Sequence, residues 1–163
     1  TEDDTIVYNL DRMAIYKELA YKTHYTGTSF DDLDAMLVNL KKEALRYMNN
    51  HLITEDDYYY EYMQMRARQC VILKRIYADI IRLTTTPEQG KALADFIRQT
   101  ADEFAEQNNV ETLLSELERL HHHYEQQQLP VTRQEFENRS MLYHILEDMK
   151  AFLDIKKDFI TAR

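Results

Sequence analysis

The longest regular pattern in the sequence lies near its carboxyl end, where apolar residues recur every three or four positions. This spacing places them on one face of an α-helix. Just after Pro130, Thr132 and Glu135 form the Thr-x-x-Glu signature of a capping box, which marks a helix start. The pattern predicts a helix that runs to about residue 161 and is on the order of 45 Å long. Its apolar positions are Leu142, Ile145, Leu146, Met149, Phe152, Leu153 and Ile160.

Five further helices are predicted upstream, each from an apolar stripe at helical spacing. Four of them have a recognisable start: Ser29 with Asp32, Thr54 with Asp57, Thr86 followed by Pro87, and Asn109 as a cap. The first three helices are expected over residues 5–23, 29–51 and 54–83. No stretch alternates apolar and polar residues for long enough to form a strand. Because the loops are short, successive helices should pack as antiparallel neighbours. The sequence therefore predicts an all-α fold, an elongated up-and-down bundle of about six helices, with the long third and sixth packed together.

The composition agrees with this fold. The chain has 163 residues, only two glycines and two prolines, and 30% charged residues, as is typical of a nearly all-helical protein. Its length suits a single domain, residues 1–163. No apolar run approaches the roughly twenty residues needed to span a bilayer, and no signal peptide is recognisable. The single cysteine, Cys70, cannot form an internal disulfide and fits a reducing compartment.

The net charge of the chain makes some classes of binding partner unfavourable. Twenty basic and 29 acidic residues give a formal net charge of −9. A field of this sign repels phosphate groups, so it argues against nucleic acid and against docking on anionic lipids through a basic patch.

The run His121-His122-His123, with Glu118 one turn earlier, resembles a metal-binding motif. A di-iron bundle needs two Glu-x-x-His motifs on two helices, and this chain has one. Consecutive residues on a helix also point about 100° apart, so the three imidazoles cannot converge on one ion. We expect no metal here. Cys70 lies on an apolar stripe, and the sequence has no Gly-rich phosphate loop or Gly-x-Ser-x-Gly elbow, so no catalytic residue and no cofactor are predicted.

Two arginines fall on apolar stripes. Arg139 lies one turn before Leu142, and Arg66 shares a face with Cys70 and Tyr62. We expect both arginines to be more than half buried, each with an anionic partner, because an unpaired buried guanidinium costs several kcal/mol.

Two interpretations of these arginines stay open. In the favoured one, internal carboxylates neutralise them and their role is architectural. In the other, Tyr62, Arg66 and Arg139 line a cleft for a carboxylate ligand, because arginine binds carboxylates through a two-pronged fork and tyrosine rings suit an aromatic acid.

The segment from Asn109 to Phe159 resembles the C-terminal domain of the bacterial aromatic acid exporter family. Three elements carry the resemblance: N-x-x-x-L-L-x-x-L from Asn109 to Leu117, L-P-x-T-R-x-E-F-E-x-R from Leu129 to Arg139, and F-L-x-I-K-x-x-F from Phe152 to Phe159. Ser140 departs from the alanine common in the family at that position. Before Asn109 the likeness is limited to the order and spacing of the helices.

This resemblance implies an accessory or regulatory domain of a membrane exporter of aromatic acids, acting by ligand or partner binding without catalysis. It implies that residues 1–163 are the soluble C-terminal part of a longer cell-membrane protein, on the cytoplasmic side, with the membrane-embedded N-terminal portion as partner. A homo-oligomer and an aromatic carboxylate ligand stay open as further partners. The alternatives are an oligomerisation module with no small-molecule site and, less favoured, a stand-alone helical metalloenzyme.

Overall fold

A computed structural model describes residues 35, 38–39, 42, 45–46, 57–84, 87–103 and 110–162. Within these residues every regular element is a helix, and no strand occurs. The helices are α3 (Asp57–Arg82), α4 (Pro87–Asp102), α5 (Glu111–Glu125) and α6 (Arg133–Thr161). The all-helical prediction is confirmed for this part of the chain.

The predicted count of about six helices is not tested. The helix expected over residues 5–23 lies outside the described residues. Of the helix expected over 29–51, only residues 35, 38, 39, 42, 45 and 46 are described, all of them helical.

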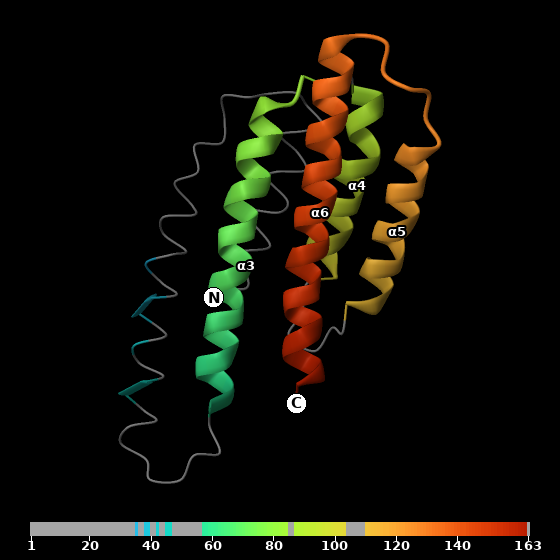
Figure 1. The fold of residues 1–163 in the computed structure, drawn as a ribbon. Coiled ribbons are helices and arrows are strands. Elements are labelled where there is room, and N and C mark those ends of the chain that lie inside the picture. Colours follow the sequence, from blue (N-terminus) through green and yellow to red (C-terminus); the bar gives the residue numbers. More distant parts are fainter. Residues whose placement is uncertain are drawn as a thin grey trace.

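The two longest described helices lie side by side and run in opposite directions (Figure 1). α3 has 26 residues and α6 has 29, against 16 for α4 and 15 for α5, as predicted. α5 packs on α6, and α4 packs on α5. No helix in the described part of the chain is both long and apolar enough to cross a membrane.

The start of α6 is the capping box predicted from the sequence. The Thr132 hydroxyl accepts a hydrogen bond from the Glu135 amide at 3.1 Å, and the Glu135 carboxylate accepts from the amides of Val131 at 2.7 Å and Thr132 at 3.3 Å. These bonds to the charged form hold the pKa of Glu135 below its usual value.

The start of α5 differs from the prediction. The N-cap is Val110 and not Asn109, which lies outside the described residues. Val110 has a left-handed backbone, with φ 63° and ψ 7°, and within the described residues no side chain caps the helix. This conformation costs a β-branched residue about 1–2 kcal/mol. The Val110 side chain is buried. We attribute the left-handed conformation to the packing of this side chain, which N-cap preferences do not take into account.

The core follows the predicted stripes. Between Leu142 and Leu153, each apolar position predicted on the α6 stripe is at most 4% exposed, and Ile160 is partly buried. Cys70 and Leu73 of α3 are fully buried against this face. The stripes of α4 and α5 also contribute to the core, with Leu93, Phe96, Ile97, Leu113, Leu117, Leu120 and Tyr124.

Candidate functional site

Arg66 lies inside the bundle, with 1% of its surface exposed, as predicted. Its Nε and Nη2 donate to the Tyr62 hydroxyl at 3.0 and 2.9 Å, and its Nη1 donates to Gln69 Oε1 at 2.6 Å. The Gln69 amide donates in turn to the Phe152 carbonyl of α6 at 2.8 Å. The structure therefore brings Tyr62 and Arg66 together in a network that joins α3 to α6. An anionic partner for Arg66 stays a prediction.

Arg139 does not belong to the network of Tyr62, Arg66 and Gln69. It is partly buried, and its Nη1 donates at 2.6 Å to the carbonyl of Gln128, in the loop between α5 and α6. Among the described residues no carboxylate lies within salt-bridge distance, and Glu135 acts on it only through space. The prediction of an anionic partner for Arg139 is therefore wrong. The α6 stripe reaches the bundle end at this residue, where a loop carbonyl replaces the expected carboxylate.

The three predicted ligand-binding residues do not form one cleft. α3 and α6 are antiparallel, with Tyr62 against Phe159 and Gln69 bonded to Phe152. Arg66 is thus level with the last turns of α6, whereas Arg139 is in the second turn. About sixteen residues of helix separate the two levels, on the order of 25 Å. A small carboxylate cannot bridge that distance.

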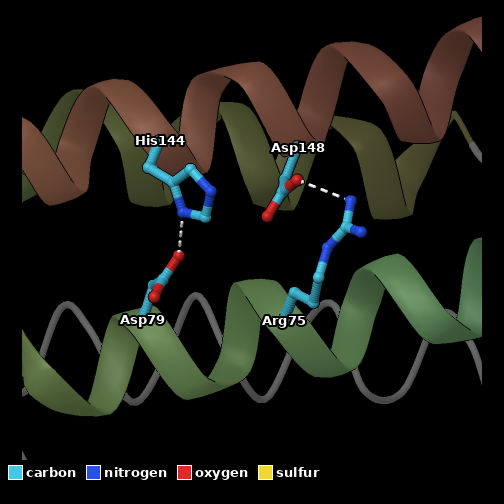
Figure 2. A network of polar contacts seen from close by, with 4 residues as sticks. All are labelled: Arg75, Asp79, His144 and Asp148. Carbon is cyan, nitrogen blue, oxygen red and sulfur yellow. Dashed lines mark hydrogen bonds and ion pairs between the residues drawn. The ribbon is translucent and has the colours of Figure 1, made fainter.

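A second polar cluster lies between these levels, where α3 faces α6 (Figure 2). Arg75 Nη2 of α3 contacts Asp148 Oδ1 of α6 at 2.8 Å. One turn further along, Asp79 Oδ2 contacts His144 Nδ1 at 2.5 Å. The side chains of Arg75 and His144 are 55% and 59% exposed, whereas those of Asp79 and Asp148 are 14% and 8% exposed. The cluster is therefore anchored by one buried and one partly buried carboxylate and is open to solvent on one side.

One oxygen of this cluster is not satisfied. Asp148 Oδ2 is buried and has no hydrogen-bond partner among the residues that the structure describes. Burying a polar atom without a partner costs about 1–3 kcal/mol, and more when it is charged. One ligand-type atom from each of Asp79, His144 and Asp148 lies within 4.8 Å of the others. The arrangement can therefore accept a hydrogen-bond donor or a cation.

These three residues were not predicted as a site from the sequence. The available signal was His144 and Asp148, four positions apart and hence on one face of a helix. Asp79 is 65 positions from His144, and only the packing of α3 on α6 brings it to them.

A groove of about 560 Å³ runs between α5 and α6, on a different face. Leu117 and Leu146 form an apolar floor together with the partly buried Leu114. Lys150 and Lys157 belong to its lining. Lys150 is paired with Asp154 at 2.6 Å, which raises the pKa of Lys150. Lys157 is exposed and has no carboxylate partner among the described residues.

His121 and His122 border this groove, and the three consecutive histidines do not converge on one point. His121 and His122 each contact the Glu125 carboxylate through Nδ1 at 3.2 Å. His123 instead packs its ring on Tyr124, with centroids 5.6 Å apart. That they bind no metal stays a prediction.

Comparisons with known proteins agree with the resemblance noted in the sequence. Residues 3–157 match the family described as "Putative aromatic acid exporter C-terminal domain". The "Uncharacterized protein YqjA" of Bacillus subtilis (strain 168) is 30% identical over 135 residues, which cover 83% of this chain and 42% of that protein.

A solved structure of a "putative membrane protein from Clostridium difficile 630" superimposes with a TM-score of 0.83 at 27% identity, over 98% of this chain and 95% of that one. The chain therefore spans less than half of the curated relative and nearly all of the solved one. Because the family match extends over almost its whole length, the chain belongs to the family described as "Putative aromatic acid exporter C-terminal domain".

Proposed function

We propose that this chain is a regulatory domain of a bacterial membrane exporter of aromatic acids, and that it binds an aromatic carboxylate without catalysing a reaction. In this proposal it lies on the cytoplasmic side of the membrane and acts on the membrane-embedded portion of the same protein. The family supports the association with an exporter. The greater length of YqjA leaves room in such a protein for a further portion.

The groove between α5 and α6 is the observation that carries ligand binding. Its volume of about 560 Å³ falls within the usual range for small-molecule sites, about 300–1,000 Å³. The leucine floor can bury an aromatic ring. The ammonium group of Lys157 can pair with the ligand carboxylate, because no carboxylate of the described residues occupies it.

Tyr62 and Arg66 are weaker candidates for this role. Arg66 is 1% exposed, and its hydrogen bonds to Tyr62 and Gln69 are internal. A ligand would have to open the α3–α6 interface and replace these bonds. Arg139 is accessible but is held by the Gln128 carbonyl.

Isothermal titration of the tag-free chain with 4-hydroxybenzoate tests the proposal. We expect saturable binding that neither acetate, which lacks the ring, nor benzyl alcohol, which lacks the carboxylate, reproduces at the same concentration. Lys157→Gln should weaken binding about fivefold or more, because it removes the charge that faces the carboxylate. Lys91→Gln on α4, outside the groove, is the matched control and should bind as the wild type does.

No binding at millimolar concentration, or equal binding by the Lys157→Gln and wild-type chains, would contradict a carboxylate site in this groove. Catalysis is tested separately. Recovery of unchanged 4-hydroxybenzoate after prolonged incubation is the expected result, and any product formed by the purified chain would refute a purely binding role.

Exposed apolar residues favour a second function, docking on the membrane-embedded portion. Leu129 is 86% exposed, Val131 is 90% exposed and Phe136 is 61% exposed, all close to the start of α6. Exposed apolar side chains that are adjacent on a surface commonly mark interaction sites. The competing explanation is that a second copy of the chain covers them, as in an oligomerisation module.

Light scattering after size exclusion, applied to the chain and to a Val131→Asp, Phe136→Asp double variant, separates these two cases. Docking on the membrane portion predicts that both proteins have the monomer mass and that only the unaltered chain associates with the separately expressed membrane portion. A larger mass that the double variant loses would identify an oligomerisation surface.

A further inference from the structure

We propose that Asp79, His144 and Asp148 bind a divalent transition-metal cation that bridges α3 and α6 (Figure 2). One ligand-type atom from each residue lies within 4.8 Å of the other two. The imidazole and one carboxylate project from a single face of α6, and the second carboxylate faces them from α3.

The donor set determines the class of metal. One imidazole nitrogen and two carboxylate oxygens suit Zn²⁺ and similar divalent transition metals, and a fourth position can hold water. Mg²⁺ and Ca²⁺ prefer oxygen ligands alone, so His144 argues against them. His144 and Asp148 are four residues apart on one helix, a spacing that places both side chains on the same face.

Independent support comes from the buried oxygen of Asp148. The Asp148 side chain is 8% exposed, and its Oδ1 is paired with Arg75, whereas its Oδ2 has no hydrogen-bond partner in the described part of the chain. In Figure 2 this free oxygen points toward α3, into the space beside the Asp79–His144 pair. A buried carboxylate oxygen without a partner is costly, and a cation at this point would satisfy it.

Binding requires a small rearrangement. Two ligand atoms on a tetrahedral Zn²⁺ are about 3.4 Å apart, because each bond is about 2.1 Å long. The Asp79 and His144 atoms are 2.5 Å apart, so this pair must separate by about 1 Å. His144 is more than half exposed and can make this movement toward solvent.

Arg75 competes with the metal for Asp148. Its guanidinium is the cation that pairs with Asp148, and its side chain is 55% exposed, so it can turn into solvent when a metal binds. The guanidinium contacts only Oδ1 of Asp148, so the other oxygen of this carboxylate is left to attract a cation. Removing Arg75 should therefore strengthen metal binding, whereas it would weaken a purely structural network.

The test is isothermal titration of the tag-free, EDTA-treated chain with Zn²⁺, with Co²⁺ as a spectroscopic probe. We expect saturation at one Zn²⁺ per chain in the micromolar range and visible Co²⁺ bands of a four- or five-coordinate site. His144→Gln should weaken Zn²⁺ binding about tenfold or more through loss of one ligand. Because this side chain is exposed, the variant should retain the helical circular dichroism of the wild type.

Two further variants complete the design. Arg75→Gln should bind Zn²⁺ several-fold more tightly than the wild type, because a competing positive charge is removed. His122→Gln removes an exposed histidine of α5 that also faces a carboxylate, and it should leave Zn²⁺ binding unchanged.

Three results would overturn the proposal: no saturable Zn²⁺ binding at 100 µM, a loss of binding in His122→Gln but not in His144→Gln, or an affinity unchanged by Arg75→Gln. The first would indicate that a water molecule, and no metal, satisfies the cluster. The second would place the metal on α5.

Discussion

The side-chain amide of Gln69 donates a hydrogen bond to the backbone carbonyl of Phe152 at 2.8 Å, across the interface between α3 and α6. The same side chain accepts from Arg66 through its Oε1. Gln69 therefore connects a buried guanidinium on one long helix to the main chain of the other.

Arg66→Met should lower the free energy of unfolding by about 3 kcal/mol, because it takes the donor from Gln69 Oε1 inside the core. Arg139→Met should cost about 1 kcal/mol or less, since Arg139 is only partly buried and donates to one loop carbonyl. Urea denaturation measures both values. Equal losses of stability in the two variants would contradict the difference between the buried environment of Arg66 and the partly exposed one of Arg139.

Asn138→Leu should cost about 2 kcal/mol, although leucine has a similar volume. Asn138 is 6% exposed, and its Oδ1 accepts from the Thr84 amide at 3.0 Å just after α3 ends. The substitution leaves that amide without its partner. Gln134→Leu is the matched control, because Gln134 contacts the same Thr84 from an exposed position, and it should cost less than about 0.5 kcal/mol. Thermal unfolding of both variants measures the two losses of stability.

Thr132→Ala should destabilise the chain by about 1 kcal/mol, because it removes the side-chain acceptor of the capping box. Thr161→Ala, at the opposite end of α6, loses only an exposed bond to the Lys157 carbonyl and should be close to neutral. If chemical denaturation showed the same stability for both variants, the capping box would not contribute as inferred.

The chain should lose stability steeply between pH 10 and pH 12. Burial raises the pKa of Tyr124 from 10.0 to about 12. The unfolded chain therefore ionises this phenol before the folded chain does. The contribution of Tyr124 is complete below pH 10 and is lost as the pH rises toward 12, a total of about 2–3 kcal/mol.

Tyr124→Phe should reduce this alkaline slope, as measured by denaturation at pH 9 and pH 11. Tyr143→Phe is the control, because Tyr143 is less buried than Tyr124. An unchanged slope in Tyr124→Phe would show that other groups cause the alkaline loss.

The amino-acid sequence alone determined the helical class, the start of α6 and the face that each described helix buries. These features depend on neighbours within one or two turns. The Thr132–Glu135 box and the stripe from Leu142 to Leu153 are complete within α6, so reading the sequence was enough to predict them. The family resemblance, carried by the segment from Asn109 to Phe159, is confirmed by a match over residues 3–157.

Only the tertiary structure decided which polar residues meet. Helical periodicity assigns a side chain to a face of its helix, but it does not specify the axial register of one helix against another. The register of α3 against α6 pairs Asp79 with His144 and Gln69 with Phe152. The same register keeps Arg66 and Arg139 far apart. Both arginines lie on apolar stripes, and for that reason the sequence allowed them to line one cleft. Val110 shows the complementary effect, because burial of its side chain overrode the local preference for a polar cap.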